Sequence, residues 1–306
     1  MDLPVVHAKE LRRLLPVGIA IDHLEEAFGA LRMPAAPKRS HFDVGTGDLL
    51  LMPAWGDQGV GVKLVTVNPT NPEAGLPLIN GLYVLFSQGT LEPIAAFDAA
   101  ELTGIRTAGV SGLATRHLAR ADAQTLVVFG AGTQAHHHLE SMLAVRAFEK
   151  LVCVSRTTWR AEELVTRARS YGVEAYVGVP DDVAVADVVC TCTTSSEPVF
   201  DGSRLAEGTH VNAVGAYKPT NRELDDVAIA RGPLVVETRE AALSEAGDLL
   251  IPIRLGVIDE SAVVADLSEV VAGKLVRRDG RDVTIFKSVG VAFEDLVIAH
   301  AAYERL

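Results

Sequence analysis

A short apolar run that leads into a glycine-rich turn constrains this chain more than any other feature. Residues 126–129 suit a buried strand, the sequence GAGTQA follows at 130–135, and a helical pattern comes next. This order matches the G-x-G-x-x-A form of the dinucleotide fingerprint, in which the first glycine allows a tight turn and the second lets a pyrophosphate approach. The free N–H groups of the helix then face the anion. The cofactor-binding candidates here are Gly130, Gly132, Thr133, Gln134 and Ala135.

Charge and composition narrow the class of protein. The 306 residues carry a net charge of −12, which argues against nucleic acid or an anionic membrane as a partner. No run approaches the length of a membrane span and no signal-peptide core is visible, so a cytoplasmic protein is expected. The three cysteines lack a second ligand pair at zinc-site spacing, and buried structural thiols are expected in place of a metal site.

The first third of the chain predicts helices and then a sheet. An apolar face with Ile21, Leu24, Ala27, Phe28 and Leu31 predicts a helix over 20–33. Strand-like runs follow at 49–52, 61–67, 78–86 and 91–97, and the last two are separated by a hairpin signal at 88–90. A further helix is expected over 98–121.

From residue 125 onward strands and helices alternate. Further strands are expected at 151–154, 174–177, 187–193, 210–214 and 234–237, with helices at 160–171 and after residue 180. The alternation predicts a parallel sheet with right-handed crossovers, that is, an α/β protein with a Rossmann dinucleotide-binding domain. Towards the end of the chain a short helix is expected over 266–272, a strand over 283–286 and a final amphipathic helix over 290–303.

The end of the second predicted strand indicates which dinucleotide is bound. An acidic residue at this place favours NAD, whereas an arginine accommodates the 2′-phosphate of NADP. The sequence here is Ser155-Arg156-Thr157, which offers a guanidinium and two hydroxyls but no acid. We therefore predict NADPH, with NADH less preferred. The alternative is that Arg156 is only a solvated residue at a helix start.

Several separate stretches resemble the ornithine cyclodeaminase/μ-crystallin family nearly end to end. They are GVKLV at 61–65, TGIRTA at 103–108, GAGTQA at 130–135, HVNAVG at 210–215 with RELD at 222–225, GDLL at 247–250, FKSVG at 286–290 and ED at 294–295. The resemblance implies a homodimer with the site between two domains. It also implies an α+β substrate-binding and dimerisation domain over 1–120 and 291–306, and the Rossmann domain over 121–290.

The basic residues of the family's substrate site fall on Arg39, Lys63 and Arg106. Two guanidiniums can bind an α-carboxylate, and a lysine can polarise or protonate the group at C2. The alternative for each residue is a surface ion pair, which fits Lys63 poorly because apolar neighbours flank it in a predicted strand.

One position departs from the cyclodeaminases. They carry an aspartate two residues after the glycine of the N-A-V-G segment, and Tyr217 occupies that position here. A phenol with a reference pKa of about 10 cannot replace a carboxylate base at neutral pH without a large shift. Cyclodeamination is therefore not expected, and the resemblance shifts to the ketimine reductase branch, which also lacks this aspartate. Lys63 and Tyr217 are the catalytic candidates.

Other polar residues complete the predicted cofactor site. The polar run 191–196 follows a buried strand and should line the cofactor cleft. From this run we predict Thr193 as a cofactor-binding residue, and Val214 is a further candidate. The resemblance places Lys287 and Ser288 near the nicotinamide, although helix N-terminal chemistry explains Ser288 equally well. Consecutive histidines at 136–138 point about 100° apart on a helix, so packing or cofactor contacts are favoured over a metal.

The expected activity is NADPH-dependent reduction of a small cyclic imino acid, Δ1-pyrroline-2-carboxylate or Δ1-piperideine-2-carboxylate. One alternative is another C–N oxidoreductase or a cyclodeaminase of the same family that acts on an amino acid or a linear imine. A second alternative is a non-catalytic, NADPH-dependent protein that binds a small ligand.

Overall fold

The computed structural model describes residues 3–30 and 33–306, and the chain forms two compact units. Unit 1 comprises residues up to Arg106 together with 291–306, and unit 2 comprises Thr107–Gly290. The division falls inside one continuous helix, α3 (Ala99–Leu118), whereas the predicted boundary at 120/121 lies just after that helix. The sequence pattern marks only the end of the helix, because its apolar periodicity continues without a break across residue 106.

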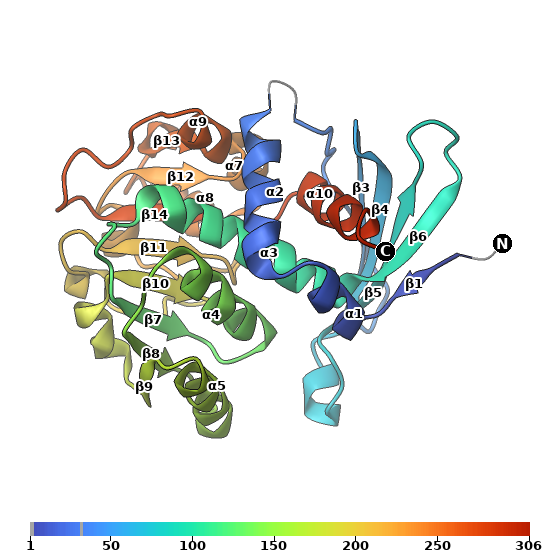
Figure 1. Cartoon of the computed structure of the whole chain (residues 1–306). Helices are drawn as coiled ribbons and strands as arrows, with labels where there is room; N and C mark the ends of the chain where they lie inside the picture. The colour runs from blue at the N-terminus through green and yellow to red at the C-terminus, as the bar shows by residue number, and fades with distance from the viewer. Residues whose placement is uncertain (1–2, 31–32) are drawn as a thin grey trace. The chain divides into compact units, whose positions relative to one another are not determined.

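Unit 1 contains a six-stranded sheet in the order β1-β6-β5-β4-β3-β2. Its strands are antiparallel except for β1, which pairs with β6 in parallel. The strands predicted at 49–52, 61–67, 78–86 and 91–97 correspond to β3 to β6 (Figure 1). The elements of this unit besides α3 are β1 (Val5–Val6), α1 (Ala8–Leu14), α2 (Val17–Gly29), β2 (Ser40–Asp43), β3 (Asp48–Gly56), β4 (Gly59–Val67), the 3-10 helix η1 (Asn71–Ala74), β5 (Ile79–Phe86), β6 (Pro93–Asp98) and α10 (Ala292–Tyr303).

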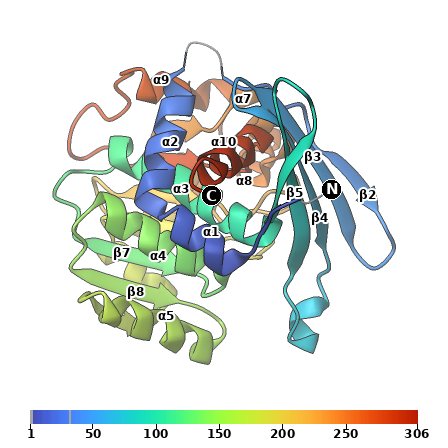
Figure 2. The same ribbon diagram turned by 45° about the vertical axis from the view of Figure 1, so that its right-hand side comes forward.

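The C-terminal helix α10 packs on strands β3, β4 and β5 and against α2, as Figure 2 shows. Phe28 of α2 meets Phe293 of α10 edge-on, with ring centroids 5.0 Å apart. The spacing that predicted the N-terminal helix is correct for Ile21, Leu24, Ala27 and Phe28, which are all buried. The helix ends at Gly29, earlier than the predicted Met33, and Leu31 lies outside the described residues.

The two faces of the unit 1 sheet differ. Along β4 the residues alternate, so that Lys63, Val65 and Val67 are buried while Leu64 and Thr66 are exposed. This alternation is the period-two pattern of a strand with one covered face. We call the uncovered side the outer sheet face; it carries the exposed side chains of Leu64 and Leu82, which lie opposite each other in register.

Unit 2 is an eight-stranded, fully parallel sheet in the order β13-β12-β14-β11-β10-β7-β8-β9. The predicted α/β Rossmann class is therefore confirmed. The strands are β7 (Thr125–Phe129), β8 (Lys150–Val154), β9 (Glu174–Val177), β10 (Val188–Thr191), β11 (His210–Ala213), β12 (Leu234–Val236), β13 (Val263–Asp266) and β14 (Thr284–Lys287).

Helices and 3-10 turns connect these strands. They are α4 (Thr133–Val145), α5 (Thr158–Ser170), α6 (Asp226–Ile229), α7 (Arg239–Glu245), α8 (Gly247–Arg254) and α9 (Leu267–Val271), with the 3-10 helices η2 (Pro180–Val185), η3 (Gly202–Arg204) and η4 (Glu260–Ala262). The sequence did not predict β13, α7 or α8. Pro252 lies inside α8 and interrupts the pattern that would mark a helix.

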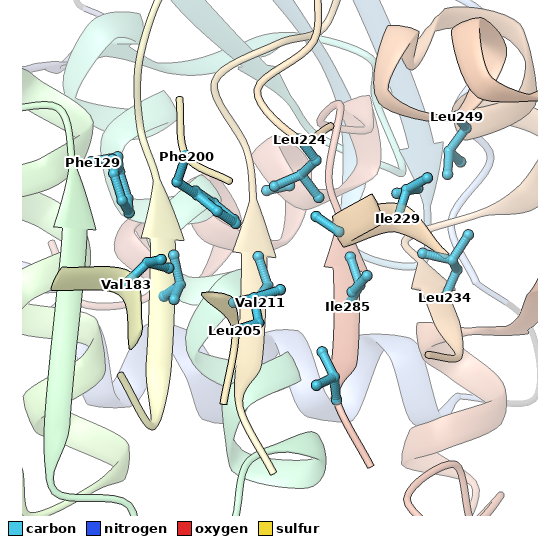
Figure 3. Close-up of a cluster of buried hydrophobic side chains, with 14 of the residues drawn as sticks. Phe129, Val183, Phe200, Leu205, Val211, Leu224, Ile229, Leu234, Leu249 and Ile285 are labelled. Atoms are coloured by element: carbon cyan, nitrogen blue, oxygen red, sulfur yellow. The ribbon is translucent and has the colours of Figure 1, made fainter. Parts of the chain in front are cut away.

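A hydrophobic cluster covers one face of the parallel sheet (Figure 3). Side chains from neighbouring strands, among them Val211, Ile285 and Leu234, contribute to it together with Leu224 and Leu249 from the segments that follow. Burial on this scale holds the strands in register, so the loops at their carboxyl ends have fixed starting points. Strand order reverses at β7, which lies between β8 and β10, and this is the switch point where such sheets bind ligands.

Candidate active site

Lys63 of β4 is buried in unit 1 beneath α10. Its Nζ atom lies 2.8 Å from Oδ2 and 3.0 Å from Oδ1 of Asp295, and it donates a hydrogen bond to Oγ1 of Thr103 at 3.2 Å. The lysine is 2% exposed and the aspartate is fully buried. A lysine on the covered face of a strand is costly to bury unless it is paired, and Asp295 supplies the pair.

Arg106 of α3 contacts the same acidic segment. Its Nη1 atom donates to Oε2 of Glu294 at 3.1 Å, and its Nε atom lies 3.4 Å from Oδ1 of Asp295. Unit 1 therefore brings together two predicted substrate-binding residues, Lys63 and Arg106. It also adds two carboxylates to which the sequence had assigned no role, although their adjacency in an otherwise apolar helix was a usable signal.

The charges around Lys63 change its proton affinity. Burial, together with the nearby positive charges of Arg106 and Arg39, outweighs the attraction of Asp295 and lowers the pKa of Lys63 from 10.5 to about 8. The third predicted substrate residue, Arg39, is partly exposed and close enough to contribute to this shift. Lys63 therefore lies among further basic groups as well as the carboxylate of Asp295. A perturbed lysine of this kind is a common feature of functional sites.

Tyr83 is a further buried polar residue of the covered face. It lies on β5 directly opposite Lys63, and a side chain at Gly61 would come within 1.9 Å of its hydroxyl. The hydroxyl is buried without a hydrogen-bond partner among the described residues, and burial together with the charge of Asp295 raises the pKa of Tyr83. The sequence did not identify this residue as part of the site, because a tyrosine in an apolar strand is expected to belong to the hydrophobic core.

The glycine fingerprint of unit 2 has the geometry that a dinucleotide requires. Gly130 has a φ of +100°, and a Cβ atom there would lie 2.5 Å from the carbonyl oxygen of Cys192. Gly132 is different: a Cβ atom there would meet no protein atom within 4 Å. Protein packing thus gives no reason for glycine at 132, whereas close approach of a ligand to the N-terminus of α4 does.

The residues around this turn also fit a bound anion. Ala135 is fully buried, so α4 packs closely on the sheet. The Oε1 atom of Gln134 is buried with no hydrogen-bond partner among the described residues, and Thr133 is exposed at the helix start. Such an unpaired group in a folded protein calls for a partner, which a ligand or water can supply.

Ser155, Arg156 and Thr157 follow β8, next to the fingerprint strand. Arg156 is exposed and makes no ion pair with any residue of the described chain. Ser155 accepts a hydrogen bond from the backbone N–H of Thr157 at 3.2 Å, and Thr157 begins α5 without capping it. An unpaired guanidinium is suited to a phosphate.

At the carboxyl ends of β10 and β11, the buried carboxylate of Glu223 holds two loops. It accepts hydrogen bonds from Oγ1 of Thr191, from N and Oγ1 of Thr193 and from N of Gly215, all at 2.7–2.8 Å. Burial raises the pKa of Glu223, opposed by the positive charge of Lys287. Val214 continues the second loop and bonds through its backbone N–H to Thr191.

Glu237 does the same for the loop after β14. Its carboxylate accepts from Oγ of Ser288 at 2.5 Å and from N of Val289 and N of Gly290 at 3.0 and 2.8 Å. Lys287 is fully buried, with Nζ 2.8 Å from Oδ2 of Asp248, and it donates to the carbonyl oxygen of Ala216 at 2.6 Å. Unit 2 thus brings Thr193, Val214 and Ser288 to one edge of its sheet. Sequence reasoning missed Glu223 and Glu237 as the residues that hold these loops.

The remaining candidates lie in unit 2. Tyr217 is partly buried against the hydrophobic cluster, and the Lys218 ammonium lies 6.0 Å from its ring centre. His138 is fully buried between Ser111 and the carbonyl of Gln134, and burial lowers its pKa to about 4.

Across residues 3–30 and 33–306 no group of three or more metal-binding side chains could hold an ion. In the same residues no helix has the length and apolar character needed to cross a membrane.

Comparison with known proteins agrees with this geometry. Residues 4–306 match the profile of the ornithine cyclodeaminase/mu-crystallin family. A Δ1-pyrroline-2-carboxylate reductase of Bacillus cereus is 38% identical over 98% of this chain and 96% of its own. The alanine dehydrogenase of Archaeoglobus fulgidus is 33% identical over 100% of this chain and 95% of its own.

A comparison with solved structures also finds a reductase of this kind. The structure of Thermococcus litoralis Δ1-pyrroline-2-carboxylate reductase with NADH and L-proline superposes with a TM-score of 0.95 at 34% identity, over 99% of this chain and 97% of that one. The match spans both units of the chain and not the dinucleotide fingerprint alone. The chain therefore belongs to the ornithine cyclodeaminase/μ-crystallin family and is a nicotinamide-dependent oxidoreductase.

Proposed function

We propose that the protein reduces a small cyclic imino acid, Δ1-pyrroline-2-carboxylate or Δ1-piperideine-2-carboxylate, to the cyclic amino acid with NADPH. The observation that carries the proposal is the buried Lys63, whose pKa is lowered to about 8 among further basic groups. A lysine with this pKa is charged at neutral pH and can still give up a proton, which is what a general acid needs. The identity to reductases of this name, 38% over 98% of the chain, supports the substrate class.

In this proposal Arg39 and Arg106 bind the substrate carboxylate. The two guanidiniums near Lys63 suit a ligand with a carboxylate, because a guanidinium donates hydrogen bonds in a geometry that matches it. Lys63 protonates the imine nitrogen or holds it in the protonated form, and Tyr217 is the second candidate for this proton. A nicotinamide cofactor, once bound, would supply the hydride that reduces the protonated imine at C2 to a secondary amine. Proline or pipecolate results.

The proposed cofactor site uses only unit 2. Gly130, Gly132 and Ala135 allow the pyrophosphate to reach the start of α4, and Thr133 and Gln134 offer side-chain contacts. Ser155, Arg156 and Thr157 would hold the 2′-phosphate, with the unpaired guanidinium of Arg156 as the main reason to prefer NADPH over NADH. Thr193, Val214 and Ser288 would line the nicotinamide end.

The test is direct. Purified protein is mixed with either imino acid and NADPH, and the loss of NADPH absorbance is followed against an enzyme-free control. We expect turnover with at least one of the two rings and formation of proline or pipecolate. A rate no higher than the enzyme-free rate with both rings would contradict the proposal.

A second candidate is reduction of a linear imine formed from a keto acid and an amine. The likeness to an archaeal alanine dehydrogenase with bound NAD, TM-score 0.94 at 32% identity, favours it. A panel of keto acids with ammonia or methylamine separates the two, because a cyclic substrate should be preferred by at least about 10-fold in kcat/KM if the first proposal is correct.

We further propose that the protein forms a homodimer. The solved alanine dehydrogenase is a dimer, and the outer sheet face of this chain exposes Leu64 and Leu82 at 37% and 39%. Contiguous apolar side chains on a sheet face are typical of a protein–protein contact. Light scattering from the purified protein should give the mass of two chains, and the mass of one would contradict the proposal.

A further inference from the structure

Asp295 lies at the centre of the buried charges in unit 1. One of its oxygens is 2.8 Å from Nζ of Lys63, and the other is 3.0 Å from the same atom and 3.4 Å from Nε of Arg106. The same carboxylate therefore contacts two of the three basic groups that the proposed function assigns to the substrate, Lys63 and Arg106. Its fully buried position in the first turn of α10 gives it one fixed place.

We propose that Asp295 is a positioning residue that acts through Lys63 and Arg106: it fixes the two basic groups relative to each other and stabilises the charged form of Lys63. The inference rests on the proposed function, in which those two residues act on the substrate. Asp295 itself touches the basic side chains, and its effect reaches the ligand through them.

The charges that face Lys63 come from every element around it. Arg106 and the Thr103 hydroxyl belong to α3, Tyr83 to β5, Arg39 to the segment before β2, and Asp295 with its neighbour Glu294 to α10. Burial and both arginines disfavour the ammonium, and Asp295 opposes them both by its charge and by its hydrogen bond. Without that carboxylate the ammonium would lose its proton at a lower pH.

Glu294 provides a matched comparison. It is the preceding residue of the same helix and is equally buried, and it forms an ion pair with Nη1 of Arg106. A change at Glu294 should therefore disturb the binding of a carboxylate through Arg106 and leave the proton affinity of Lys63 nearly unchanged. A purely structural role for the acidic pair would give both variants the same phenotype.

The experiment compares Asp295→Asn, Glu294→Gln and the unchanged protein, all full length. Two quantities are measured from pH 6 to pH 10: kcat/KM for the imino acid, and the Kd of pyrrole-2-carboxylate, a planar ring carboxylate that cannot accept hydride at C2. In the unchanged protein both should worsen as pH rises through about 8, because Lys63 loses its proton there. Asp295→Asn should move this transition about 1–2 pH units lower, so that Kd at pH 8 rises about 5-fold or more.

Glu294→Gln should weaken binding at every pH without moving the transition. Equal transitions in Asp295→Asn and the unchanged protein would overturn the inference. If Asp295→Asn does not fold, Lys63→Arg replaces it, because an arginine stays charged throughout this range. The loss of binding above pH 8 must then disappear, and its persistence would overturn the inference. The Kd series does not need turnover, so it tests Asp295 even if the imino acid proves not to be the substrate.

Discussion

Each unit of the molecule contains a buried lysine with a buried aspartate 2.8 Å away, and the two pairs have different surroundings. Lys63 in unit 1 lies near Arg106 and Arg39, whose positive charges disfavour its ammonium form. Lys287 in unit 2 faces Asp248, the carbonyl oxygen of Ala216 and the carboxylate of Glu223, and its charge opposes the rise that burial causes in the pKa of Glu223. The first lysine thus has basic neighbours and the second has acidic ones, and this is why we propose a ligand-binding role for Lys63 and a structural role for Lys287.

The strongest test of this comparison is Lys63→Met. We expect turnover to fall by about 10²- to 10⁴-fold, because the proton donor is lost. Dinucleotide binding should remain, since the fingerprint belongs to the other unit, and Arg106 still contacts Asp295. Steady-state rates and NADPH titration by fluorescence measure the two effects. If the Lys63→Met variant turned over substrate near the normal rate, Lys63 would have a structural role and no catalytic one.

Lys287→Met is the matched change in unit 2. It leaves the buried carboxylate of Asp248 without its ion-pair partner, and we expect the free energy of unfolding to fall by about 3–5 kcal/mol. Urea denaturation followed by circular dichroism measures this loss. A variant that keeps its stability and loses only turnover would show that Lys287 takes part in the reaction and that the two lysines do not differ as described.

Arg156 is a third kind of cation, exposed and unpaired within the described chain. Arg156→Ala should reduce the preference for NADPH over NADH by about 10- to 100-fold, because charge-assisted hydrogen bonds to the phosphate are lost. Arg160→Ala is the control: that guanidinium lies over the Trp159 ring at 5.1 Å. Kd values for both dinucleotides provide the measurement. An equal change in both variants would remove Arg156 from the phosphate site.

The smallest effect concerns the unpaired hydroxyl beside Lys63. Tyr83→Phe should not lower the free energy of unfolding and should raise it by up to about 1 kcal/mol, because it removes a buried hydroxyl without a hydrogen-bond partner among the described residues. Thermal and urea unfolding provide the check. A loss of more than about 1 kcal/mol would mean that the hydroxyl has a partner in solution, as the polar groups of Glu223 and Glu237 have in unit 2.

Local patterns predicted much of this fold. A strand-like run located β4, and the apolar run before the glycine fingerprint located β7, each to within two residues, because strand and turn chemistry act over short distances. The short β13 and the helix containing Pro252 were missed, since neither carries a clear periodic signal.

The candidate site was predicted only in part, and for a related reason. The apolar neighbours of Lys63 in a predicted strand indicated that this lysine is buried. Nothing local indicated that its partner is Asp295, which lies 232 residues away in the sequence. Glu223 and Glu237 were missed similarly, because their roles depend on loops from other strands. Pairing across such distances is a property of the tertiary structure, and a single sequence does not record it.

The position of α10 has a consequence for how the protein is made. The sheet of unit 1 is synthesised early, but the helix that packs on it and carries Asp295 emerges from the ribosome only after all of unit 2. Until then Lys63 and Arg106 have no carboxylate from that helix, and the apolar face of the sheet is uncovered. Contacts of such large sequence separation form late and slowly. The nascent chain can thus complete the parallel sheet of unit 2 first, and the buried charges around Lys63 and Asp295 are brought together last.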